Sequence, residues 1–184
     1  MEDQAIGSNM KILQQLRDDF DYRYNKIDGA TLFIYGLEQN SKIQLQDRSE
    51  LLSMLYAAKN GETVDQYEMQ KAWENLYTYI GWSLDDLDSM VLVPLKGDVL
   101  TYAKFQTVDL SYDFSQQQWL KDIQDSGSRK VLMLGGETPH DYYTGGKSGI
   151  ITFARNIFIP DNPYEKEPLG TILINIDNSM FANM

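Results

Sequence analysis

Two apolar runs near the end of the chain constrain its fold more than any other feature. The runs are Ile150–Ile159 and Thr171–Ile176, and both are rich in β-branched residues. A polar loop that contains three prolines separates them. Runs of this composition on either side of turn-forming residues indicate two antiparallel strands joined by a fairly long connection.

Arg155 is the single charged residue of the first run and lies between Phe153 and Ile157. A guanidinium group in a buried strand needs a carboxylate, a carbonyl or a ligand to offset the cost of its desolvation. Arg155 is therefore a candidate ligand-binding residue. The alternative is that it pairs with a neighbouring aspartate of the same protein.

The composition excludes several classes of function. The 184-residue chain has a formal net charge of −11, which disfavours nucleic acids and anionic membrane surfaces as partners. Because it has no cysteine, disulfides, thiol catalysis and cysteine-based metal sites are excluded. Its apolar runs are too short for a transmembrane helix or a signal peptide. We therefore expect contact with a membrane only through flanking spans that are absent from this chain.

The first part of the chain carries the pattern of a long amphipathic helix. Apolar residues recur every three or four positions from Ile6 to Ile27, and the pattern resumes from Ala30 to Leu37. Gly29 lies between these two parts and is a candidate position for a kink. A helical pattern of about 40 residues is longer than most globular helices. It predicts either a dimer seam between two copies of the chain or a helix packed along the sheet.

The remaining elements can be assigned from periodicity and turn residues. Helices are predicted near residues 49–58, 63–80 and 115–123, the second with Thr63 as its N-cap. A hairpin is predicted at 90–105 with Pro94 at an edge or a bulge, and a strand at 130–134. Helices gathered in the first part, followed by strands with short connections, indicate an α+β fold rather than alternating βαβ units. We expect about five antiparallel strands.

No catalytic motif stands out. The single histidine, His140, has no nucleophile-elbow pattern around it, and the glycines near Lys147 lack the spacing of a phosphate-binding loop. We therefore expect no catalytic residue, no metal and no cofactor. An alternative is a small secreted hydrolase that uses loop carboxylates, drawn from Glu137, Asp141, Asp161 and Glu165.

A ligand pocket is the better-supported prediction. Aromatic rings with a few directional polar groups suit a small polar ligand such as a sugar, an amino acid or an organic acid. The residues expected to bind it are Trp119, Asp141, Tyr142, Tyr143 and Arg155. The competing interpretation is that the aromatic residues only pack in the core or in loops, in a structural dimerisation module without a ligand.

The chain resembles a known family at its C-terminal end. The segments Ile151–Ile157 and Pro168–Asp177 are similar to the strand motifs that close the PAS-like sheet of extracytoplasmic Cache sensor domains. The likeness is strongest to YesM-type sensor histidine kinases of Gram-positive bacteria. The resemblance implies a PAS-like Cache fold with a long N-terminal helix and a ligand cavity on one face of the sheet.

This resemblance implies an organisation and a function. We expect a signalling helix at 1–45, a Cache sensor domain at 46–177 and the start of a connector at 178–184. The domain itself would not be an enzyme, whereas the whole protein would be a membrane-bound, two-component histidine kinase with this domain on the extracytoplasmic side. It would bind a small polar ligand and form a homodimer through the N-terminal helix. The alternative output is that of a chemoreceptor or a cyclase.

Overall fold

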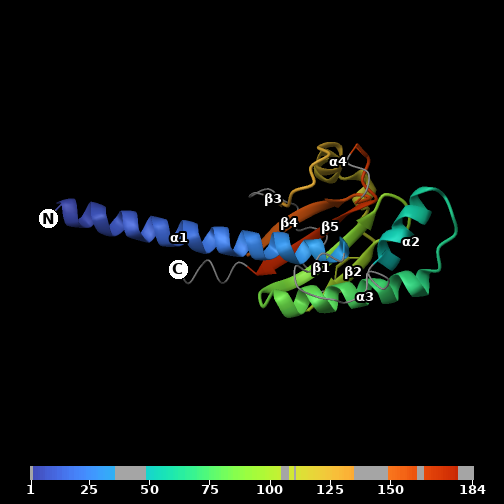
Figure 1. The fold of residues 1–184 in the computed structure, drawn as a ribbon, viewed down its shortest axis with the longest axis horizontal. Helices are drawn as coiled ribbons and strands as arrows, with labels where there is room; N and C mark the ends of the chain where they lie inside the picture. Colours follow the sequence, from blue (N-terminus) through green and yellow to red (C-terminus); the bar gives the residue numbers. More distant parts are fainter. Residues whose placement is uncertain are drawn as a thin grey trace.

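The computed structural model describes residues 2–35, 49–104, 108–109, 111–134, 149–160 and 164–177. Its elements follow the order helices, hairpin, short helices and three strands (Figure 1). They are α1 (Glu2–Thr31), the 3-10 helix η1 (Leu32–Tyr35), α2 (Ser49–Lys59), α3 (Gln66–Ser83), β1 (Leu87–Pro94), β2 (Leu100–Ala103), the 3-10 helix η2 (Phe114–Gln116), α4 (Gln118–Asp125), β3 (Leu132–Leu134), β4 (Ile150–Ile157) and β5 (Gly170–Asp177).

The strands form one antiparallel sheet in the order β2-β1-β5-β4-β3. The two C-terminal runs pair along their whole length, from Ile150 opposite Asp177 to Ile157 opposite Gly170. The predicted strand pair and the predicted α+β fold with five antiparallel strands are thus confirmed. The order also places β5 in the middle of the sheet, between β1 and β4.

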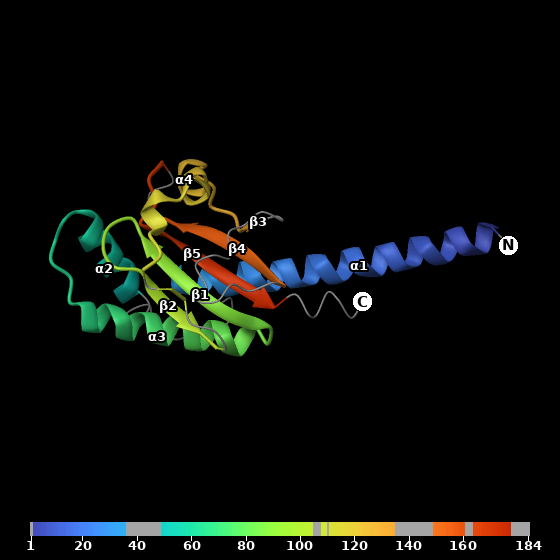
Figure 2. The same ribbon diagram turned by 180° about the vertical axis from the view of Figure 1, so that it is seen from behind.

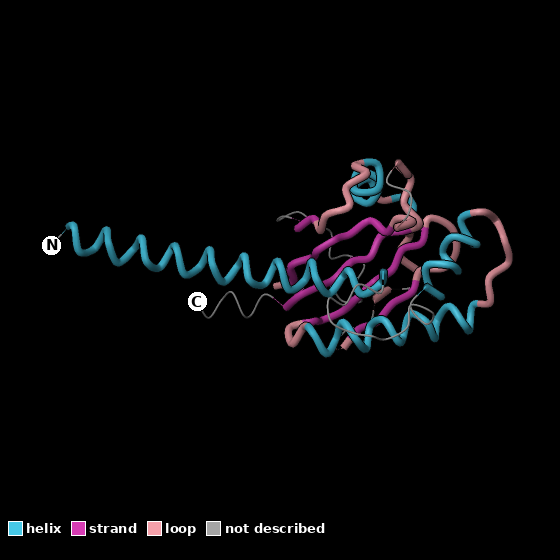
Figure 3. The backbone as a smooth tube through the Cα atoms, in the orientation of Figure 1, coloured by secondary structure: helices cyan, strands magenta, loops and turns pink. Residues whose placement is uncertain are grey.

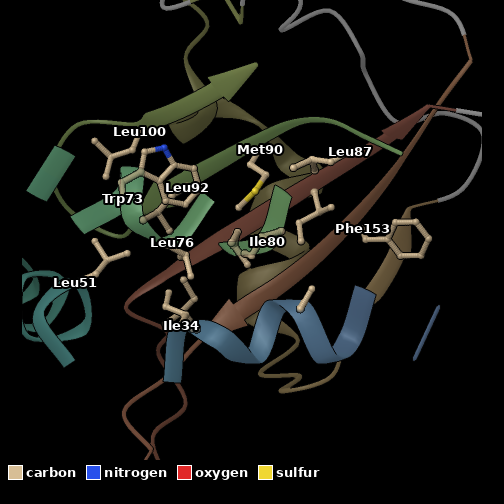
Figure 4. Packing of buried hydrophobic residues seen from close by; sticks show 14 of the residues in the cluster. Ile34, Leu51, Trp73, Leu76, Ile80, Leu87, Met90, Leu92, Leu100 and Phe153 are labelled. Atoms are coloured by element: carbon tan, nitrogen blue, oxygen red, sulfur yellow. The ribbon is translucent and has the colours of Figure 1, made fainter. Parts of the chain in front are cut away.

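The two faces of the sheet are covered by different helices. The end of α1, with η1, α2 and α3, packs on one face around Trp73 and Ile80 (Figure 4). We call this the α1 face. The short helices η2 and α4 pack on the other, around Leu120 and Ile123, as the two opposite views show (Figures 1 and 2). We call this the α4 face. Because strand side chains alternate between faces, neighbours along β1, β4 and β5 enter different cores.

One local prediction holds and one differs from the structure. Pro94 is the last residue of β1 and lies at a local edge as predicted, because β1 pairs with β2 only as far as Leu92 and at Pro94 has β5 as its one paired neighbour. The irregularity in β1 lies at its other end, between Leu87 and Ser89. The N-cap of α3 is Asp65, whose carboxylate accepts hydrogen bonds from the backbone N–H groups of Tyr67 (2.9 Å) and Glu68 (3.3 Å), and not Thr63.

The long N-terminal helix extends well beyond the sheet (Figure 3). It continues through Gly29 and ends at Thr31, so the predicted kink position is helical. Near its C-terminus, Tyr24 and Ile27 pack against the α1-face core. Further toward the N-terminus, Met10 and Leu13 on the same stripe are 64% and 63% exposed. The predicted stripe therefore has a buried part and an exposed part.

Some predictions concern segments outside the described residues. The boundary expected at residue 45 and the connector expected at 178–184 both lie there. Within the described ranges, none of the helices combines the length and apolar character that crossing a membrane requires.

Gly170 is the position where close packing of backbone against backbone requires glycine. A Cβ atom there would lie 2.7 Å from the carbonyl oxygen of Val93 and 2.9 Å from the Cα of Pro94. We expect Gly170→Ala to lower the free energy of unfolding by about 1–3 kcal/mol, as overpacking does. Gly29→Ala is the matched control, because nothing lies within 4 Å of its Cβ position. In a helix interior this change should stabilise by about 0.5–1 kcal/mol. Urea denaturation of both variants measures the difference, and equal stability of the two would contradict the account.

Candidate functional site

The α4 face carries polar side chains in the middle of the sheet. Its side chains form rows across β1, β5 and β4, as the strand register shows. One row is apolar, with Val91, Leu173 and Ala154. The rows on either side of it contain fully buried hydroxyl and amide groups, which is unusual because such groups are costly to bury unless they are hydrogen-bonded.

The first of these, which we call the polar row, consists of Ser89, Asn175 and Thr152. All three are fully buried, at 0% exposure. The Thr152 hydroxyl donates to the Asn175 side-chain oxygen (2.7 Å), and the Asn175 amide donates to the Ser89 hydroxyl (2.9 Å). The side chains thereby link three adjacent strands through a continuous set of hydrogen bonds. Since a hydroxyl has one donor and two acceptor positions, Thr152 keeps acceptor capacity after it donates to Asn175.

The opposite row anchors α4 to the sheet. The Thr171 hydroxyl donates to the Asn156 side-chain oxygen (2.9 Å), and the Asn156 amide donates to the backbone carbonyl of Ile123 (2.6 Å). Gln124 adds a longer bond from its amide to the Thr171 hydroxyl (3.4 Å). The polar groups at this end of the α4 face are therefore used to hold a helix.

Trp119 lies on the same face, at the start of α4. Its ring packs edge-on against Phe114, with ring centroids 6.5 Å apart, and joins the core that contains Leu120. Its indole Nε1–H is buried and donates to no acceptor within the described part of the chain. A buried donor that lacks an acceptor costs about 1–3 kcal/mol. This makes Trp119 a group that a ligand or a bound water would stabilise.

A pocket opens at the α4 end of this face. Its volume is about 380 Å³, within the range of roughly 300–1,000 Å³ that is usual for small-molecule sites. Val93, Val99 and Phe114 contribute apolar surface, and Lys121 and Gln124 contribute polar groups. The α4 face thus offers both an enclosed polar row and a more open pocket at the opposite end.

Arg155 belongs to the α1 face. It is 5% exposed, and its guanidinium group donates to the carboxylate of Asp28 in α1 and to the backbone carbonyl of Arg129 (2.7 Å). This is the aspartate pair that the sequence left open as the alternative. Nearby, burial raises the pKa of the Tyr35 hydroxyl, an effect that the hydrogen bond from the Phe158 N–H and the charges of Arg155 and Arg129 oppose.

The predicted site residues do not come together as a group. Trp119 and Arg155 lie on opposite faces of the sheet, because Arg155 points toward α1 while Trp119 packs over the α4-face core. The other three, Asp141, Tyr142 and Tyr143, lie outside the described residues. A ligand-binding role for each of the five therefore stays a prediction.

Of the four carboxylates in the hydrolase alternative, only one lies among the described residues. Glu137, Asp141 and Asp161 lie outside the described residues. The fourth, Glu165, accepts a hydrogen bond from the ammonium group of Lys59 (3.1 Å). Burial lowers the pKa of Lys59, but hydrogen bonds and negative charge from Glu165 and Glu167 outweigh it and raise this pKa above its ordinary value. Glu165 thus takes part in an ion pair that fastens the end of α2.

The polar row carries hydrogen-bonding groups and no ionisable group. Hydroxyl and amide groups donate and accept hydrogen bonds but carry no charge near neutral pH. Among the described residues, no group of histidine and carboxylate side chains could hold a metal ion. Sequence reasoning missed Ser89, Thr152 and Asn175, because only the strand register brings these distant positions side by side.

The polar row lies beside the last residues of β2 and β3. Ser89 pairs with Ala103, the last residue of β2, and Thr152 pairs with Leu134, the last residue of β3. Residues 105–107 follow β2 and residues 135–148 follow β3, and both segments lie outside the described residues. In the sequence, the second segment carries the predicted site residues Asp141, Tyr142 and Tyr143.

Comparison with known proteins identifies the fold. No protein-family model and no curated protein sequence matches the chain. Among solved structures, the sensory domain of the Campylobacter jejuni chemoreceptor Tlp3 is similar, with a TM-score of 0.58 and 13% sequence identity, over 94% of this chain and 59% of that one. The ligand-binding domain of Tlp3 in complex with L-norvaline gives 0.57 and 14%, over 95% and 57%. Its complex with L-valine gives 0.57 and 13%, over 94% and 58%.

These similarities concern the fold. The chain spans 57–59% of the length of the chemoreceptor structures that it matches. The long helix followed by a five-stranded antiparallel sheet is thus an architecture that the chain shares with these structures. The expected α+β fold with a long N-terminal helix agrees with it.

Proposed function

We propose that this chain is a ligand-sensing domain of a bacterial membrane receptor and that it binds a small polar molecule on the α4 face. The observation that carries the proposal is the fully buried polar row, Ser89, Thr152 and Asn175, on the same face as the Trp119 indole. The shared fold supports it, because the similar structures are sensory domains and two of them are described with amino acids bound.

The chemistry of the face limits the ligand. Hydroxyl and amide groups of the polar row recognise hydroxyl, amide, carboxylate or amine groups by hydrogen bonding. The Trp119 ring adds an apolar surface with one outstanding donor. Sugars, amino acids and organic acids all satisfy these requirements, so the ligand class we propose is a small polar molecule of this kind.

The domain acts in signalling rather than in catalysis in this proposal. We propose that the domain lies on the extracytoplasmic side of the cell membrane. We also propose that the whole protein is a two-component histidine kinase, because the strand motifs of this chain resemble those of YesM-type receptors. A chemoreceptor is the second candidate, since the similar structures belong to one. Sequencing the full gene tests both candidates. Either receptor requires an encoded membrane span, and the kinase also requires an encoded phosphoacceptor histidine domain.

Thermal unfolding in the presence of sugars, amino acids and organic acids tests ligand binding. We expect at least one compound to raise the melting temperature, since a ligand at a hundred times its dissociation constant adds about 2.7 kcal/mol of stability. Trp119→Ala and Thr152→Val should each abolish or strongly reduce this shift, because they remove the indole donor and the row hydroxyl.

Trp82→Ala is the matched control for the loss of a tryptophan. Trp82 is 77% exposed, in α3 on the other side of the sheet, so its removal should leave the shift unchanged. Two results would contradict the proposed site. A shift that is lost in Lys121→Ala but kept in Trp119→Ala would place the ligand in the pocket beside α4. A shift that is lost only in Arg155→Gln would place it on the α1 face.

We also propose that two copies of the chain pair through the exposed part of the α1 stripe. Met10, Leu13 and Leu16 continue the line of Tyr24 and Ile27 beyond the sheet, and all three are exposed. A second copy of the same helix would cover this stripe with an identical one, which is the usual arrangement of an apolar helical seam. A paired helix would also give the receptor a continuous element along which to transmit movement.

Sedimentation equilibrium tests the pairing. The wild-type chain should show a mass twice its 21.2 kDa, and Leu13→Glu should weaken the dimer at least about tenfold, because it buries an unpaired carboxylate in the seam. Lys11→Glu changes an exposed residue on another side of the helix and serves as the control. A wild-type monomer at high concentration, or equal weakening by both changes, would contradict this seam.

A further inference from the structure

Two consecutive residues of β4 hold the two ends of one short segment of chain. Because strand side chains alternate, Asn156 points to the α4 face and Arg155 to the α1 face. Asn156 donates to the backbone carbonyl of Ile123 in α4 (2.6 Å), and Arg155 donates to the backbone carbonyl of Arg129 (2.7 Å). The segment between them, residues 123–131, passes from the α4-face core at Ile123 to the α1-face core at Val131. We call residues 123–131 the connector, which is a different segment from the C-terminal connector expected at 178–184.

The connector is braced from within. The Ser126 hydroxyl donates to the Ile123 carbonyl (2.6 Å) and accepts from the Ser128 N–H (3.2 Å). The Ser128 hydroxyl accepts in turn from the N–H of Lys130 (3.2 Å). Gly127 makes the turn with a φ of +60°, which favours glycine. These bonds restrain the backbone of the connector at successive positions.

The far end of the connector is fastened to α1. The Tyr24 hydroxyl donates to the Val131 carbonyl (2.6 Å), and Asp28, one helical turn later, accepts from Arg155 through its carboxylate. Arg155 therefore joins the connector and α1 through a single guanidinium group. Because Arg155 is 5% exposed, separating it from Asp28 would leave a buried charge without its counter-charge, which is strongly unfavourable.

We propose that the connector, with Arg155 and Asn156, is a relay that couples the position of α4 to that of α1. The inference rests on the proposed function in one respect, namely that a ligand on the α4 face is what displaces α4. A displaced α4 moves the Ile123 carbonyl, the braced connector carries this movement to Arg129 and Val131, and Tyr24 and Asp28 pass it to the helix. The coupling is a property of the chain itself and is present without a ligand.

Hydrogen–deuterium exchange of the whole unliganded chain tests the relay. Asp28→Asn removes the charge that Arg155 binds, so amides of α1 near residues 24–31 should exchange faster. The relay predicts that amides of α4 and the connector also exchange faster, by at least about fivefold relative to amides of β5. A factor of about five is the lower end of the usual coupling between two sites. Because coupling is reciprocal, Asn156→Ala should in turn accelerate exchange in residues 24–31 of α1.

Lys59→Gln is the control for general loosening of the fold. It breaks the ion pair with Glu165 (3.1 Å) that fastens the end of α2, which involves neither the connector nor α1. It should leave exchange in α4 at the rate of the wild type relative to β5. The relay is overturned if Asp28→Asn accelerates α1 but leaves α4 unchanged relative to β5, or if Lys59→Gln accelerates α4 equally. Since no ligand is present, failure to find a ligand would not alter either result.

Discussion

Burial of the central strands on both faces is the constraint on which the rest of this structure depends. Every side chain of β1 is buried, and so are all those of β5 except the last, Asp177. A polar side chain in such a strand must find its partner inside the protein, because water is not available. Ser89, Thr152 and Asn175 satisfy one another on the α4 face, and Arg155 is satisfied by α1 and the connector on the other.

This constraint gives the two faces different roles. The α1 face is a large apolar core covered by three long elements, with Arg155 as a fastening point for the helix (Figure 4). The α4 face is covered by one helix of eight residues and the short η2, and rows of buried polar groups lie on either side of its small apolar core. The first arrangement suits mechanical stability, whereas the second suits the binding of a small polar molecule. The proposed sensing role would use both.

Local patterns were sufficient to predict the elements but not their faces. The β4–β5 pair, the helices and the α+β fold follow from composition and turn residues, which act over a few positions. The alternation that would assign each residue to a face is hidden, since β5 is buried on both faces as far as Ile176. Local patterns therefore place Trp119 and Arg155 in one pocket, although the two residues lie on opposite faces of the sheet. The polar row could not be predicted from the sequence, because only the strand register brings Ser89, Thr152 and Asn175 together.

The central claim, that a ligand binds on the α4 face, is tested most directly by the indole signals of the protein. The chain has three tryptophans, so a nitrogen-15 spectrum contains three indole N–H resonances. Titration with the stabilising sugar, amino acid or organic acid should shift the Trp119 resonance to saturation, because its buried donor gains a partner or a new neighbour. The exposed Trp82 should not move. Saturable binding that shifts Trp82 or Trp73 and leaves Trp119 unchanged would contradict the account.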